Sequence, residues 1–68
     1  MLSYERHSLI IEELRNSLTV TVEALSKLLN VSENTIRRDL NTLEKAGKLK
    51  RIQGGAIGVS DRSVLGNL

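Results

Sequence analysis

Apolar residues recur at intervals of three and four along the first part of the chain, which is the spacing of an amphipathic helix. The apolar stripe consists of Ile10, Ile11, Leu14 and Leu18. It predicts a helix from about Ser3 to Leu18, with the acidic and basic residues facing water. Tyr4 and His7 fall on the edge of the stripe. We expect Tyr4 to lie in the core or to anchor its edge, and His7 to have a structural role.

A run of β-branched residues follows, from Thr19 to Val22. It is too short to stand alone and predicts one short strand of a small sheet. Thr21 can also cap the N-terminus of a second helix that runs to Leu29, with Glu23 in its first turn, where the helix dipole favours an acid. The residues that this helix is expected to bury are Val22, Leu25, Leu28 and Leu29.

The second helix is separated from a third by only a few residues. Asn30 tolerates the left-handed backbone conformation that ends helices, so a tight turn is expected there. Ser32 is a good N-cap for the third helix. That helix should continue to about Ala46 and stop at Gly47, a C-cap glycine.

The pattern then changes to the alternation of a strand in residues 48–52. Gln53, Gly54 and Gly55 form a turn, and residues 56–59 can return antiparallel. The chain is therefore predicted to be mainly α with a small β part: three helices and a β-hairpin. Residues 1–59 form the expected domain, and residues 60–68, which have no pattern, are expected to be a linker.

Two helices joined by so short a turn satisfy the requirements of a helix-turn-helix. Ser26 is small enough for the point where the helices cross, and Asn30 suits the unusual backbone of the turn. The residues expected to fill the shared interior are Leu25, Leu29, Val31 and Ile36.

On a helical wheel the third helix has one apolar face and one polar face. Ile36, Leu40 and Leu43 point inward. The outer face consists of Asn34, Arg38, Asn41 and Lys45, flanked by Thr35, Arg37 and Thr42. Arginine reads guanine and asparagine reads adenine in the major groove of DNA, whereas phosphates accept from many polar groups. The alternative is an ordinary solvated face, but such a face mixes acids among its cations, and here Glu33 and Glu44 lie toward the core-facing border and Asp39 lies at the side.

Charge and composition support this interpretation. The net charge is +2, and residues 31–68 hold seven of the ten Lys and Arg, so the cations gather where the third helix and the hairpin lie. Cysteine is absent and His7 is the only histidine, which excludes disulfides and argues against a metal site. No apolar run is long enough for a membrane span, and the N-terminus lacks a signal-peptide pattern, so a cytoplasmic protein is expected.

Three stretches carry a family resemblance: VSENTIRRDL (31–40), LEKAGKL (43–49) and RIQGGA (51–56). Together they closely resemble the N-terminal domain of the DeoR family, and the resemblance extends from Tyr4 to Ile57. Only Gln53 departs from the pattern, where the family commonly has histidine. The resemblance implies a winged helix-turn-helix fold in which the hairpin is the wing.

The resemblance also implies which residues contact DNA. The expected contacts of the recognition helix and its start are Ser32, Asn34, Thr35, Arg37, Arg38, Asn41 and Lys45. Lys48, Lys50 and Arg51 would approach the backbone beside the wing. Asp39 would orient a neighbouring arginine or cap locally, since a carboxylate facing phosphate is repelled. Gly54 and Gly55 either touch DNA at the wing tip or simply form the turn.

Members of the family are transcriptional regulators, so the expected partner is a double-stranded DNA operator. The resemblance further implies a repressor of a sugar or related metabolic operon, made oligomeric by a C-terminal domain that binds a phosphorylated sugar and is missing here. One alternative function is a protein-interaction module, which should expose an apolar patch on the third helix; its outer face has none. An enzyme is not expected, because no catalytic constellation or phosphate-binding loop is present, and no cofactor is expected.

Overall fold

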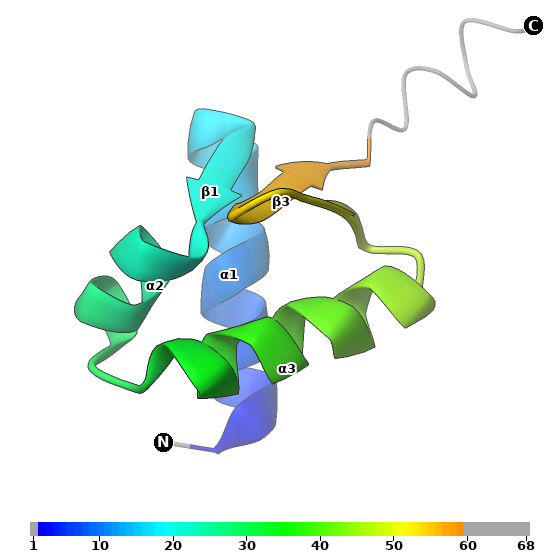
Figure 1. The fold of residues 1–68 in the computed structure, drawn as a ribbon. Coiled ribbons are helices and arrows are strands. Elements are labelled where there is room, and N and C mark those ends of the chain that lie inside the picture. Colours follow the sequence, from blue (N-terminus) through cyan, green and yellow to red (C-terminus); the bar gives the residue numbers. More distant parts are fainter. Residues whose placement is uncertain (1, 60–68) are drawn as a thin grey trace, which may run out of the picture.

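The computed structural model describes residues 2–59, which form three helices and three short strands (Figure 1). In chain order the elements are α1 (Ser3–Ser17), β1 (Thr19–Thr21), α2 (Val22–Leu29), α3 (Glu33–Lys45), β2 (Leu49–Ile52) and β3 (Gly55–Gly58). The predicted fold class is confirmed: a mainly helical domain with a small antiparallel sheet, consistent with a winged helix-turn-helix. The linker expected at 60–68 lies outside the described residues.

The start and the end of α1 are each fixed by a specific hydrogen bond. At its start the backbone N–H of Leu2 donates to Oε1 of Glu5 at 2.7 Å. The helix ends at Ser17, one residue earlier than predicted, because Leu18 turns out of the helix with φ 68. The carbonyl oxygen of Leu18 accepts a hydrogen bond from the backbone N–H of Gly58 at 3.0 Å. This bond connects the end of α1 to the last residue of β3.

The caps predicted for the helix-turn-helix are confirmed. The Thr21 side chain accepts from the N–H of Ala24 at 3.0 Å and begins α2. Asn30 ends α2 in the left-handed conformation, with φ 58 and ψ 47. The Ser32 hydroxyl accepts from the N–H of Thr35 at 3.2 Å and begins α3. These three residues fix where α2 begins and ends and where α3 begins.

The sheet has the order β1-β3-β2, and both pairings are antiparallel. The central strand begins at Gly55, one residue earlier than predicted, because Gly55 pairs with Thr21 on one side and with Ile52 on the other. A side chain cannot occupy this position, since a Cβ on Gly55 would lie 1.9 Å from the carbonyl oxygen of Val20. Gly54, in the turn before it, has φ 79, a conformation that favours glycine.

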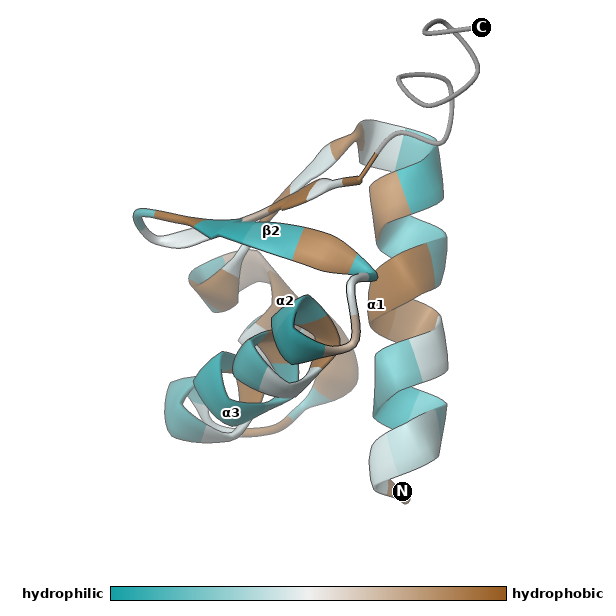
Figure 2. Ribbon diagram, turned by 90° about the vertical axis from the view of Figure 1, so that its right-hand side faces the viewer, coloured by the Kyte–Doolittle hydropathy of each residue, from teal (hydrophilic) through white to brown (hydrophobic). Residues whose placement is uncertain are grey.

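The core lies where α1, α2, α3 and the sheet meet, and it is built from aliphatic side chains. Figure 2 shows the apolar segments of these elements in brown. The buried apolar residues are Ile10, Leu14, Val20, Val22, Leu25, Leu29, Ile36, Leu40, Leu43, Leu49 and Ala56. Within residues 2–59, no helix has the length and the apolar character of a membrane span.

Leu28, which was predicted to be buried, and Tyr4, which was expected in the core or at its edge, are exposed instead. Leu28 is 59% exposed, because it lies about 90° around α2 from the centre of the buried face at ~100° per residue. Tyr4 is 65% exposed, because it lies about 100° from the centre of the buried face of α1. The period of the apolar pattern was correct, but Leu28 and Tyr4 were assigned to a wider buried face than these helices have. Leu18 of the predicted stripe is 67% exposed as well, because it lies past the end of α1.

Candidate nucleic-acid interface

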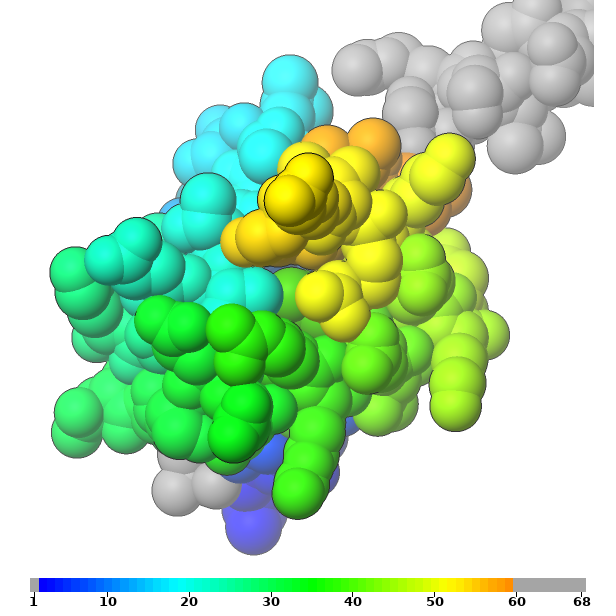
Figure 3. All heavy atoms as spheres, in the orientation of Figure 1, coloured from blue at the N-terminus to red at the C-terminus, as the bar shows by residue number. Residues whose placement is uncertain are grey.

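α3 and the hairpin of β2 and β3, which we call the wing, lie on one face of the molecule. Figure 3 shows α3 in green directly beside the wing in yellow. Figure 2 shows that α1 lies on the opposite side, behind α3 and the wing. The helix and the wing can therefore meet the same partner, while α1 supports them from behind.

The outer face of α3 is polar and exposed, as predicted. Ile36, Leu40 and Leu43 are buried beneath it. We use the name α3 outer face for the exposed residues Asn34, Arg37, Arg38, Asn41 and Lys45. This set holds three cations and two amides and no carboxylate.

The first turn of α3 is held by its own side chains. The hydroxyls of Ser32 and Thr35 lie 3.0 Å apart, and Ser32 also caps the helix. Ser32 is exposed and Thr35 is half-buried. Both therefore have a structural role that is complete without DNA, and their contact with phosphate stays a prediction.

The two neighbouring arginines of α3 are held differently. Arg37 donates to Oδ1 of Asn34 at 3.0 Å and to Oε1 of Glu33 at 3.1 Å. No side-chain hydrogen bond or ion pair within residues 2–59 holds Arg38, which is exposed. Arg38 can thus extend toward a partner without breaking a bond, whereas Arg37 has to be released from an acid first.

Arg51 on β2 connects the wing to α3, which the sequence analysis missed. Its guanidinium donates to Oδ1 of Asn41 at 2.5 Å and to the carbonyl of Gly55 at 3.3 Å. Its backbone N–H donates to Oε2 of Glu44 at 2.8 Å. The only indication in the sequence was that Arg51, on a predicted strand, follows a helix whose outer face carries polar side chains. These contacts fix the wing against the C-terminal half of α3.

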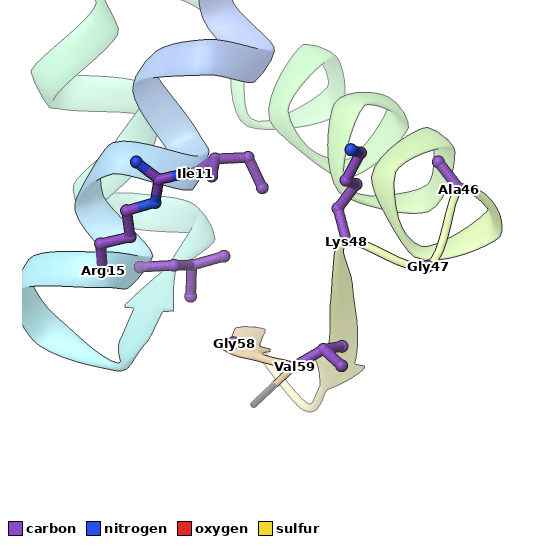
Figure 4. Close-up of a pocket in the computed structure, with 8 residues that line it drawn as sticks. Ile11, Arg15, Ala46, Gly47, Lys48, Gly58 and Val59 are labelled. Atoms are coloured by element: carbon purple, nitrogen blue, oxygen red, sulfur yellow. The ribbon is translucent and has the colours of Figure 1, made fainter. Parts of the chain in front are cut away.

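The predicted lysines do not all lie together. Lys45 and Lys50 are exposed on α3 and β2. Lys48 instead lines a groove beside α1, where it lies across from Ile11 and Arg15 (Figure 4). The structure therefore brings Arg51 against the α3 outer face, to which Lys45 belongs, leaves Lys50 exposed on β2, and places Lys48 at the margin toward α1.

Asp39 has a different partner from the one expected. It is only 4% exposed, and it accepts from Nε of Arg6 at 2.6 Å and lies 3.1 Å from Nε2 of His7. Both partners come from α1, so the carboxylate ties α1 to α3 and does not orient an arginine of its own helix. The sequence could have suggested this, since His7 lies on the core-facing side of α1 and Asp39 lies beside the buried face of α3.

The electrostatics of this cluster favour the charged carboxylate. Burial raises the pKa of Asp39, but the hydrogen bonds and charges of Arg6 and His7 outweigh it and hold that pKa below its usual value. The same contact raises the pKa of Arg6. Asp39 therefore adds no open negative charge to the face that α3 presents.

The comparisons with known proteins agree with this geometry. Residues 6–62 match the family model of the DeoR-like helix-turn-helix domain. The chain is 52% identical over 61 residues to the HTH-type transcriptional regulator FruR of Bacillus subtilis, a match that covers 90% of this chain and 24% of that protein. No solved structure was found to match the chain.

Other relatives are transcriptional regulators as well. GolR of Listeria innocua is 44% identical over 84% of this chain, and UlaR of Escherichia coli is 37% identical over 91% of it. The chain spans about a quarter of the length of these relatives: 22% of GolR and 25% of UlaR. All of these relatives are named as transcriptional regulators, and this family is not enzymatic. The chain belongs to the DeoR-like helix-turn-helix family and is the DNA-binding domain of a DeoR-type transcriptional regulator.

Proposed function

We propose that the α3 outer face enters the major groove of a double-stranded DNA operator and that the wing lies along the adjacent backbone. The observation that carries this proposal is the exposed run of cations and amides on α3. Of the nearby acids, Glu33 accepts from the Arg37 guanidinium and Glu44 from the backbone N–H of Arg51. Such a face offers donors to base edges and phosphates, and it is held rigidly by the caps of α3 and by the Arg6–Asp39 pair.

Individual residues then have separate roles. Arg38, Asn34 and Asn41 read base edges from the middle of α3. Phosphates are contacted from the start and end of α3 and from the wing, by Ser32, Thr35, Arg37, Lys45, Lys48, Lys50 and Arg51. Glycine is required at position 54 by the left-handed φ and at position 55 by the close approach to β1. We therefore assign Gly54 and Gly55 to the shape of the wing and not to DNA contact.

We further propose that the full-length regulator represses a sugar or related metabolic operon. The relatives are about four times as long as this chain, which leaves room for a second domain that binds a phosphorylated sugar and forms a homo-oligomer. Tethering two such domains would raise affinity through effective concentration, without new contacts in either domain. The domain alone should then be a weakly binding monomer that ignores sugar phosphates.

Selection of DNA from a random pool by this domain tests the proposal. We expect one enriched motif, bound equally well in the presence and absence of a panel of sugar phosphates. Arg38→Ala should lose the motif, whereas Lys27→Ala, which removes one exposed cation from α2, should keep it. A pool that shows no enrichment at low salt would overturn DNA recognition, and a ligand-dependent affinity would place the sensor within this domain.

A further inference from the structure

The contact between Arg51 and Asn41 determines which way the amide of Asn41 is turned. A guanidinium has only donors, so the amide atom that faces it must be the oxygen. Oδ1 of Asn41 accepts from Arg51 at 2.5 Å, and the same guanidinium is held on its other side by the carbonyl of Gly55. The amide nitrogen of Asn41, which carries two hydrogens, is the group left for a further partner.

A similar arrangement recurs about two turns earlier on α3. Oδ1 of Asn34 accepts from Arg37 at 3.0 Å, and Arg37 is itself held by Glu33. Each asparagine of the α3 outer face thus gives one of the two acceptor positions of its oxygen to arginine. Because Arg38 and Lys45 have only donors, the face offers mainly donors.

This matters because an asparagine recognises adenine through both of its amide atoms. The oxygen accepts from the adenine amino group while the nitrogen donates to N7. An amide oxygen has two lone pairs, but one that already accepts from a cationic guanidinium is a weaker acceptor, and a second donor beside that cation is repelled. The contact with Arg51 therefore opposes the hydrogen bond from the adenine amino group. Guanine and thymine present only acceptors in the major groove, so a donor alone can satisfy them.

We propose that Asn41, held by Arg51, reads a guanine or thymine edge and disfavours adenine and cytosine. Arg51 is a positioning residue in this recognition, since it acts on base choice through Asn41. The inference rests on the proposed insertion of α3 in the major groove. It replaces the adenine recognition that an asparagine at this position suggests from sequence alone.

The test is the selection of DNA from a random pool by five forms of the domain. The wild type gives the motif, and Asn41→Ala identifies the base pair that Asn41 contacts, because preference should vanish at that pair alone. We expect guanine or thymine there, preferred over adenine by about three- to tenfold, as one hydrogen bond would give. Arg51→Ala frees Oδ1 of Asn41, so preference at the same pair should move toward adenine.

Two variants separate this effect from loss of charge. Arg51→Lys keeps a donor next to Asn41 and should keep the wild-type preference. Lys50→Ala removes a cation from the same strand and should weaken all sequences by one factor without changing any base preference. Adenine at the Asn41 pair in the wild-type motif, or an unchanged preference in Arg51→Ala, would overturn the inference. Failure of the wild type to enrich any motif would instead count against the proposed function.

Discussion

Nε of Arg6 lies 2.6 Å from Oδ2 of Asp39, so the first turn of α1 is bonded directly to the middle of α3. Nη2 of the same guanidinium donates to Oδ1 at 3.1 Å, which makes the contact bidentate. A planar fork of this kind fixes orientation as well as distance. The helix that carries the α3 outer face is thus positioned from behind through a buried carboxylate.

Asp39→Asn should destabilise the domain, because it removes the charge and leaves the volume nearly unchanged. Arg6 keeps part of its side chain in water, so solvent screens the pair, and we expect the free energy of unfolding to fall by about 1–2 kcal/mol. Urea denaturation measures this. The control is Glu23→Gln, which breaks the exposed pair with Lys27 and should cost about 0.3–0.5 kcal/mol. Equal losses in the two variants would contradict a supporting role for Asp39.

The contribution of Asp39 should also depend on pH. Its pKa is lower in the folded domain than the ordinary value of 3.8, so the folded state binds the proton less tightly than the unfolded state. The stabilisation is therefore complete above about pH 5 and is lost as the pH falls through the ordinary and then the lowered pKa. The difference in unfolding free energy between wild type and Asp39→Asn should shrink between about pH 5 and pH 2. A difference that is the same at both pH values would show that the carboxylate is not stabilised in the folded state.

DNA binding by this domain should weaken steeply with salt. If about five phosphates are neutralised, the logarithm of the binding constant should fall with the logarithm of salt concentration with a slope near −4 to −5. Fluorescence anisotropy with labelled DNA at several salt concentrations gives this slope. An affinity independent of salt is incompatible with the cations gathered on α3 and the wing.

Arg38→Ala and Lys50→Ala should weaken DNA binding in different ways. Arg38 lies at the centre of the α3 outer face, so its loss should cost about 1–3 kcal/mol of binding free energy and relax preference at one base pair. Lys50 should contact phosphate, so its loss should weaken all sequences equally and reduce the salt slope by about 1. Competition binding assays with matched and mismatched DNA sites distinguish the two roles. If both variants lose the same factor of affinity for all sites, Arg38 reads no base.

The sequence was sufficient to predict the features that depend on local interactions. Asn30, Thr21 and Ser32 determine where α2 and α3 begin and end through contacts within a few residues, and these were placed correctly. The inner and outer faces of α3 follow from its period. Local signals of this kind survive folding because neighbours in sequence remain neighbours in space.

Contacts between elements could not be predicted in the same way. The partners of Asp39 lie 32 and 33 residues away on α1, and Arg51 reaches Asn41 only because the wing folds back along α3. The width of each buried face also depends on what packs against it, which is why Leu28 was wrongly assigned to the core. These are consequences of packing, and no spacing in the sequence encodes them.

The two glycines of the wing, Gly54 and Gly55, are required for different reasons. Gly54 has φ 79 but open space around its Cα, so Gly54→Ala should cost about 1–2 kcal/mol from backbone strain alone. At Gly55 a Cβ would lie 1.9 Å from the carbonyl oxygen of Val20, and the atom in the way is backbone, which cannot rotate aside. Gly55→Ala should therefore separate β1 from β3 and lower the free energy of unfolding by about 3 kcal/mol or more.

Urea denaturation compares the two variants, with circular dichroism to detect a Gly55→Ala domain that is already partly unfolded in water. Equal midpoints for the two variants would show that β1 and β3 do not approach as closely as their register requires.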